Sequence, residues 1–164
     1  MLIDADLAAA LAAIADELHW MQSPTYSDAV LGEGFIDDYG WCHIIGPEGF
    51  FKGDDFLLGF LMLGPNRHYR DHYHPAPELY WPLTSHSLWK RGQGQFAERA
   101  AGEFVWHEPN EIHATRTAGR QPLPALGNRL DRPRLLLVHL SGDFALQRIQ
   151  QRFRLRHAVA VAAR

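Results

Sequence analysis

The chain has 164 residues, of which 46% are apolar, and a formal net charge of −3 at pH 7. This size and apolar content suit one soluble domain with its own core, and the charge offers no electrostatic basis for binding nucleic acid or an anionic membrane. The single cysteine, Cys42, excludes an intramolecular disulfide and a thiolate cage around zinc. No segment approaches the ~20 apolar residues of a membrane span. The apolar stretch 7–15 lacks the basic flank of a signal peptide, so we expect a cytoplasmic protein.

The first 40 residues have a helical pattern. Apolar side chains recur at helical spacing from Leu7 to Leu18, which predicts a helix over residues 4–21 with an aspartate at its start. Residues 22–40 contain a proline and three glycines and predict an irregular connector or a short second helix. We therefore expect residues 1–40 to form a helical extension that packs on the rest of the domain.

Short apolar or alternating runs begin near residue 41 and are separated by turn residues. The predicted strands are 41–45, 56–63, 68–74, 78–83, 86–91, 95–98, 103–107, 112–117 and 134–140. Residues 118–133 hold three prolines and two glycines and predict an irregular excursion, and residues 143–156 predict a short C-terminal helix. Many short strands without helices between them predict an all-β sandwich or barrel over residues 41–164.

The stretch with the most chemical information runs from His72 to Tyr80 and reads His-Tyr-His-Pro-Ala-Pro-Glu-Leu-Tyr. His72 and His74 share a face if the strand is regular, and Glu78 and Tyr80 share a face for the same reason. Two imidazoles and a carboxylate that converge are typical ligands of a first-row metal. A fourth ligand has to come from another segment, and His113 is the best candidate.

Strand parity gives a more detailed expectation. In a regular strand over 68–74, the even-numbered residues, which include His68, lie on one face, and the odd-numbered ones, such as Tyr69, lie on the other. Prolines 75 and 77 then bend the chain, which can return Glu78 to the same centre. We expect His68 to support the metal site or contact substrate. His86 and His107 are expected to face solvent or support the ligands rather than bind metal.

These segments resemble the two motifs of the cupin superfamily. The first contains His72-x-His74-x3-Glu78, and the second contains Gly102, Pro109 and His113. Asn110 stands where the second motif has a turn glycine, and asparagine tolerates the left-handed backbone well. The resemblance implies a jelly-roll β-barrel that carries an N-terminal helical extension and a short C-terminal helix. It also implies one divalent transition metal, either Zn, Fe(II), Mn, Ni or Co, bound by these three histidines and the glutamate.

Within the cupins, the chain is most similar to the cupin-type dimethylsulfoniopropionate (DMSP) lyases and their lyase-like relatives. The similarity rests on His68-x3-His72-x-His74-Pro-Ala-x-Glu78-x-Tyr80 and on the segment that follows His113. It implies a metal-dependent carbon–sulfur lyase that cleaves DMSP to dimethyl sulfide and acrylate by β-elimination, with Tyr80 as the catalytic base.

The implied substrate is a small carboxylate with a sulfonium cation at its other end. Aromatic faces attract such cations, so Tyr73, Trp81 and Trp106 are expected substrate contacts. A homodimer is a reasonable expectation, because cupins often pair through exposed strands. Two other functions stay open: another metal-dependent cupin enzyme, such as a dioxygenase or an isomerase, and a non-catalytic ligand-binding cupin.

Overall fold

The computed structural model of the protein describes residues 10, 13–14, 16–118 and 123–130. Within this part of the chain, two short helical elements precede a set of strands. The helical elements are α2 (Asp28–Leu31) and the 3-10 helix η1 (Ile36–Asp38). The strands are β1 (Tyr39–Ile45), β2 (Phe56–Leu63), β3 (His68–His72), β4 (Glu78–Pro82), β5 (Ser87–Arg91), β6 (Ala97–Arg99), β7 (Val105–His107), β8 (His113–Thr117) and β9 (Leu123–Leu130).

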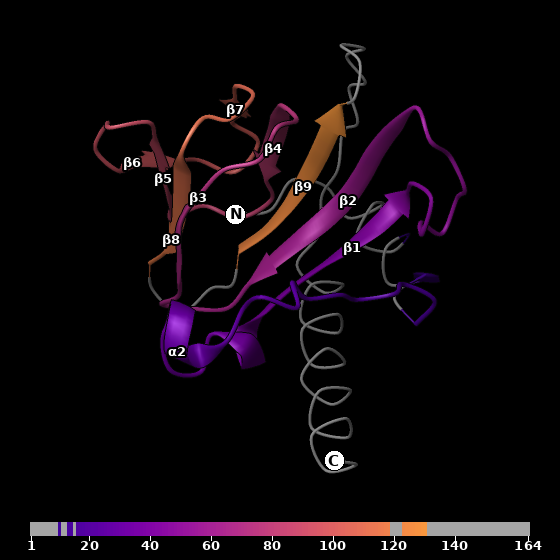
Figure 1. Ribbon diagram of the computed structural model, residues 1–164, viewed down its shortest axis with the longest axis horizontal. Coiled ribbons are helices and arrows are strands. Elements are labelled where there is room, and N and C mark those ends of the chain that lie inside the picture. Colours follow the sequence, from indigo (N-terminus) through magenta and orange to yellow (C-terminus); the bar gives the residue numbers. More distant parts are fainter. Residues whose placement is uncertain (1–9, 11–12, 15, 119–122, 131–164) are drawn as a thin grey trace.

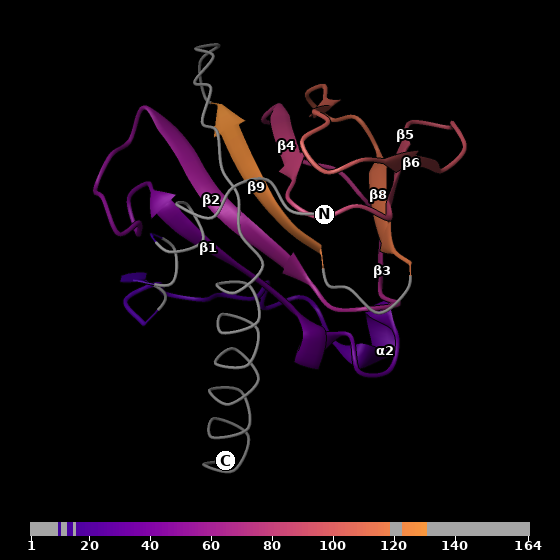
Figure 2. The same cartoon turned by 180° about the vertical axis from the view of Figure 1, so that it is seen from behind.

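The strands form two antiparallel sheets (Figures 1 and 2). The five-stranded sheet has the order β1-β2-β9-β4-β7, and the four-stranded sheet has the order β3-β8-β5-β6. Several neighbours are far apart in sequence, such as β3 and β8 or β4 and β9. This topology confirms the predicted all-β architecture. It also brings the two histidine-containing segments of the sequence next to each other.

Most predicted strands are present with small changes at their ends, but the predicted irregular excursion over 118–133 is wrong in part. Strand β9 lies inside that range and pairs with β2 on one side and β4 on the other. The sequence disguises it, because Pro124 lacks an amide hydrogen and prolines are rarely found in central strands. Pairing on both sides supplies the stabilisation that local propensity does not predict.

The N-terminal helix is shorter than predicted at its C-terminal end. Residues 10, 13 and 14 are helical, residues 16–17 form a turn, and Met21 pairs with Trp41 in an isolated β-bridge. The other residues of that predicted helix up to position 15 lie outside the described part of the chain. The same is true of the predicted strand 134–140 and of the predicted C-terminal helix 143–156.

Polar contacts attach the segment 22–38 to the strands. The Gln22 side-chain amide donates hydrogen bonds to the carbonyls of Ile36 and Tyr39, both at 2.6 Å. From the other side, the Arg67 guanidinium forms an ion pair of 2.8 Å with Asp38. The segment is therefore held against the sheets, while the domain boundary at residue 40 stays a prediction. Within the described residues, none of the helices has the length and apolar character needed to cross a bilayer.

The core lies between the two sheets and extends under segment 22–38. Its buried members come from both sheets and from the N-terminal segment: Leu31, Phe35, Tyr39, Leu61, Leu63, Tyr69, Tyr80, Trp89 and Val105. Four of these nine residues are aromatic rings with a polar atom. Such rings combine apolar burial with a group that needs a hydrogen-bond partner, so this core has polar atoms close to its centre.

One buried hydroxyl joins the β2–β3 connection to the end of β8. Thr117 donates to the Gly64 carbonyl at 2.6 Å and accepts from the Arg67 backbone amide at 2.8 Å. We expect Thr117→Val to lower the free energy of unfolding by about 1–3 kcal/mol, because it leaves two buried backbone groups unpaired at nearly constant volume. Urea denaturation measures this. The matched control is Thr25→Val at an exposed position; an equal loss in both variants would contradict the prediction.

Candidate metal centre

Strand register determines which side chains meet at the centre of the molecule. Strand β3 pairs with β8 so that His72 lies opposite His113, and β4 pairs with β7 so that Glu78 lies opposite His107. Residues opposite each other in antiparallel strands project to the same face of the sheet. The backbone pairing therefore brings one His–His pair and one Glu–His pair, each from distant parts of the sequence, toward one region between the sheets.

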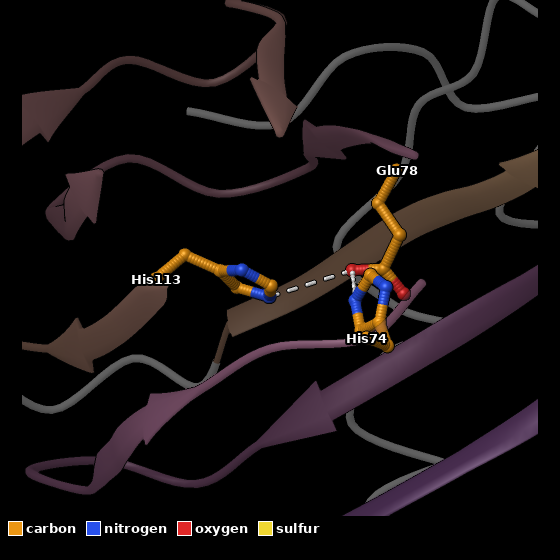
Figure 3. A group of neighbouring side chains, drawn as sticks. All are labelled: His74, Glu78 and His113. Atoms are coloured by element: carbon orange, nitrogen blue, oxygen red, sulfur yellow. Dashed lines mark ion pairs between the residues drawn. The ribbon is translucent and has the colours of Figure 1, made fainter. Parts of the chain in front are cut away.

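Three predicted ligands converge in this region (Figure 3). Glu78 Oε2 lies 2.8 Å from His74 Nε2 and 3.6 Å from His113 Nε2. The three ligand atoms all lie within 4.8 Å of one another. His74 and Glu78 flank the proline-containing turn between β3 and β4, so the bend expected from the sequence does bring the carboxylate to the histidines.

The three histidines that were predicted as ligands are oriented in the same way. In each, Nδ1 lies within hydrogen-bonding distance of a backbone carbonyl two residues away: 2.8 Å for His72 and Arg70, 2.7 Å for His74 and Ala76, and 2.8 Å for His113 and Glu111. A carbonyl can only accept, so Nδ1 carries the proton and donates it. In a neutral ring, the lone pair is then on Nε2, which is the arrangement that metal-binding histidines commonly use.

Burial and neighbouring charges set the protonation of these groups. Burial alone would raise the pKa of Glu78, but the close contact with His74 and the positive charge that His74 and His113 carry when protonated offset it, and the pKa lies below its ordinary value. Burial lowers the pKa of His72 to about 4 and also lowers that of His113. At neutral pH the site therefore offers a carboxylate and at least two neutral imidazoles, the forms that bind metals.

The donor set fits a divalent cation. His74 Nε2, Glu78 Oε2 and His113 Nε2 are buried and have no hydrogen bond of good geometry from the described residues. Buried polar atoms in this state carry a large desolvation cost. A cation between them would satisfy all three, and mixed nitrogen and oxygen ligation is compatible with several first-row metals.

His72 lies beside this group rather than within it. Its ring stacks on Tyr69 with centroids 4.0 Å apart and planes at 20°, and its centroid is 4.2 Å from that of His113. The register of β3 shifts between Tyr69 and His72. This irregularity corrects the parity prediction: Tyr69, expected on the opposite face, is buried and contacts His72.

A cavity of about 350 Å³ opens beside the ligand group. Tyr80 and Tyr73 line it together with His72, His74 and Glu78. Tyr73 is 67% exposed and so sits at its rim, whereas Tyr80 is buried. Glu78 and Tyr80 both line the cavity, which agrees with the prediction that the two side chains share a face.

The structure does not bring three other predicted residues, His68, Trp81 and Trp106, to this cavity. His68 packs edge-on against Phe96, Trp81 packs against Phe104, and Trp106 donates a hydrogen bond of 2.8 Å to Glu108. Strand parity explains why Trp81 lies away from the cavity, because it follows Tyr80 in β4 and points to the opposite side of the sheet. His68 precedes the irregularity in β3, so it does not share a face with His72.

The sequence analysis missed the environment of His107. Its side chain is fully buried, and its ring stacks on that of His113 with centroids 4.0 Å apart and planes at 15°. Burial lowers its pKa to about 2. Of the two alternatives expected for His107, exposure to solvent is wrong, and the contact with His113 agrees with a role in supporting the ligands. His86 is exposed as expected. The sequence holds no local signal for this burial. It follows from the pairing of β4 with β7, which places His107 opposite Glu78.

The turn before His113 follows the expectation for Asn110. This residue has a φ of 60°, in the left-handed region that asparagine tolerates. Its backbone amide donates a hydrogen bond of 2.8 Å to the His74 carbonyl. The turn is thereby attached to the loop that holds His74, so the two ligand segments are connected through the backbone as well as through the ligand atoms.

Comparisons with known proteins agree with this geometry. Residues 3–125 match the sequence profile of the dimethylsulfoniopropionate lyase family. The chain belongs to the dimethylsulfoniopropionate lyase family. It is 29% identical over 119 residues to dimethylsulfoniopropionate lyase DddQ of Ruegeria pomeroyi, a match that covers 73% of this chain and 53% of that protein. It is 26% identical over 113 residues to a putative DMSP lyase, DddL, of Cereibacter sphaeroides, covering 69% and 46% of the two chains. The chain thus spans about half the length of these curated relatives.

Solved structures show the same fold. The crystal structure of DMSP lyase DddQ from Ruegeria pomeroyi superposes with a TM-score of 0.68 at 25% identity, over 82% of this chain and 68% of that one. A cupin-like protein of Thermotoga maritima superposes with a TM-score of 0.51 at 14% identity, over 79% and 95% of the two chains. The second match shows the fold alone. The cupin architecture expected from the sequence is therefore confirmed.

Removal of a ligand imidazole should reduce metal binding. We expect His113→Ala to weaken affinity for a divalent metal by more than about 100-fold, since loss of an outer hydrogen-bonding partner alone commonly costs 10–100-fold. Metal content after dialysis, measured by mass spectrometry, tests this. His19→Ala is the matched control, because His19 is exposed and lies outside the cluster. Equal metal content in the two variants would remove His113 from the ligand set.

Proposed function

We propose that the protein is a metal-dependent lyase that cleaves dimethylsulfoniopropionate to dimethyl sulfide and acrylate. The observation that carries this proposal is the group of His74, Glu78 and His113 within 4.8 Å, with Tyr80 two residues after the carboxylate in the same cavity. Membership of the DMSP lyase family supports it. The activity stays a proposal because the chain spans only about half of its curated relatives.

We assign four side chains to one divalent metal: His72, His74, Glu78 and His113. The buried Nε2 atoms of His74 and His113, the ionised carboxylate, and the contact of the His72 ring with that of His113 support this assignment. Zn, Fe(II), Mn, Ni and Co are all compatible with the donor set. When bound, the metal supplies Lewis-acid stabilisation of the negative charge that develops on the substrate carboxylate. The same residues would orient that carboxylate toward Tyr80.

The reaction needs a base at the carbon next to the carboxylate. We assign this role to the Tyr80 oxygen, which takes the proton as the C–H electron pair forms the carbon–carbon double bond. The C–S bond breaks, and sulfur leaves with its electron pair as neutral dimethyl sulfide, so acrylate is the second product. A phenol has an ordinary pKa of ~10, and a cation nearby would lower it and favour the phenolate.

The structure supports a defined position for this base. Tyr80 is 8% exposed, and its ring lies 5.1 Å from that of Trp89. Packing of the ring fixes the direction of the hydroxyl, which lowers the entropic cost of orienting the base toward the substrate. For the sulfonium end, we propose contact with the aromatic rings that line the cavity, among them Tyr73 at the rim.

The sharpest test is Tyr80→Phe, which removes one oxygen and keeps the ring. We expect turnover to fall by at least about 100-fold, the usual scale for loss of a general base, with metal content and the unfolding midpoint close to wild type. Headspace detection of dimethyl sulfide from the metal-loaded protein and DMSP measures this. Unchanged turnover with full metal would contradict the mechanism.

The same assay separates the proposed lyase from the other cupin functions. A lyase needs no oxygen, so turnover under anaerobic conditions distinguishes it from a dioxygenase. Wild-type protein that holds its metal and releases no dimethyl sulfide would contradict the proposed function. Acrylate should appear in equal amount to dimethyl sulfide, because each elimination releases one of each.

A further inference from the structure

Three tyrosines from separate parts of the chain meet beside the metal-ligand group. Tyr26 comes from the segment before α2, Tyr39 begins β1, and Tyr69 lies in β3. The hydroxyls of Tyr26 and Tyr69 are 2.9 Å apart, and those of Tyr39 and Tyr69 are 3.5 Å apart. All three side chains line the cavity that also contains Glu78 and Tyr80. We call Tyr26, Tyr39 and Tyr69 the tyrosine triad.

The triad lies next to the proposed ligands. Tyr69 stacks on His72 at a centroid distance of 4.0 Å. Tyr39 and Glu78 line the same cavity. A small molecule held by the metal-ligand group would therefore have triad hydroxyls on one side of it.

The ring faces of the triad are packed against other rings. Phe35 stacks on Tyr39 with centroids 4.9 Å apart, and His72 covers a face of Tyr69. The rings of Tyr26 and Tyr69 also meet edge to face at 5.8 Å. Rings whose faces are occupied by other rings are poor partners for a cation, which binds over an open face. The polar ends are the parts left for a ligand.

The hydrogen bonding of the triad is incomplete. Three hydroxyls have three protons, and the two contacts between them use two. The contact of 3.5 Å is also long for a bond between hydroxyls, whose usual distance is below about 3.0 Å. Burial raises the pKa of Tyr39 well above its ordinary value, so this phenol stays a neutral donor. Among the contacts of the described residues, at least one O–H is thus available for an acceptor, and a ligand oxygen could replace the long contact.

A carboxylate in this cavity needs such donors. The described residues that line the cavity include neither lysine nor arginine. Among the side chains that the structure describes around the cavity, an anionic substrate group thus finds neutral donors beside the metal-ligand group. Hydrogen bonds from neutral groups to a charged acceptor are stronger than those between neutral groups.

We propose that Tyr26, Tyr39 and Tyr69 form a neutral hydrogen-bond donor site for the carboxylate of the substrate beside the metal-ligand group. This inference rests on the proposed function only for the identity of the substrate; the ligand chemistry it assigns is that of a short-chain carboxylate. It makes the N-terminal segment part of the site, because Tyr26 completes the triad from outside the two sheets.

The experiment compares two probes of similar shape, propionate and uncharged propionamide, by calorimetry on the zinc-loaded full chain. We expect Tyr26→Phe and Tyr39→Phe each to weaken propionate binding by about 5- to 10-fold, the scale of one hydrogen bond to a charged group. Propionamide binding should change by less than about two-fold, since it lacks the charge. Zinc stoichiometry should stay at the wild-type value in both variants.

Thr25→Val is the control, because it removes an exposed hydroxyl next to Tyr26 in the same segment. It should bind propionate as wild type does. If Tyr39→Phe does not fold, Tyr26→Phe carries the test, because its side chain is only partly buried. Wild-type affinity for propionate in the phenylalanine variants, or no propionate binding by the wild type, would overturn the inference.

Turnover measurements separate this inference from the proposed function. If DMSP is cleaved, both variants should raise KM more than they lower kcat, since the triad binds the carboxylate and does not move the proton. If the wild type cleaves no DMSP but the variants still lose propionate affinity, the proposed function fails and the carboxylate site stands. If the wild type cleaves DMSP but the variants keep wild-type propionate affinity, the proposed function stands and the carboxylate site fails.

Discussion

The antiparallel register between β3 and β8 is the constraint on which the site depends. It places His72 opposite His113, and the antiparallel pairing of β4 with β7 in the other sheet places Glu78 opposite His107. Because opposed residues share a face, a slip of one residue in either pairing would turn these side chains away from the cavity. The ligand geometry is thus a property of strand pairing, and the turn that attaches Asn110 to His74 reinforces it.

The same arrangement explains how several polar groups can be buried in a cavity whose described lining has no lysine or arginine. Backbone carbonyls orient the histidines, and burial keeps His72 and His113 in the neutral form. Glu78 supplies the negative charge, so the group is incomplete without a cation. A lyase of the proposed kind would use the bound cation to hold a carboxylate substrate. Aromatic packing around Tyr80 would hold the ring of the proposed base in one position.

Residues outside the two sheets contribute side chains to the cavity. Segment 22–38 is attached through Gln22 and the Arg67–Asp38 ion pair, and it brings Tyr26 to within 2.9 Å of Tyr69. A cavity with metal ligands on one side and neutral hydroxyls on the other would bind a carboxylate without a lysine or arginine from its described lining. Sequence similarity in the histidine motifs alone does not identify this second side.

Local sequence determined the all-β class, most strand positions and the approach of His74 to Glu78, because alternation, turn residues and ligand spacing are all short-range signals. The sequence named His113 as a ligand, but the pairing of β3 with β8 brings it to the site. Tertiary structure decided the rest. Strand β9 forms despite Pro124 because it has a partner on each side, and the irregularity in β3 turns Tyr69 inward against strand parity. The burial of His107 and the meeting of Tyr26, Tyr39 and Tyr69 depend on pairing between residues far apart in the chain, and such pairing leaves no local pattern to detect.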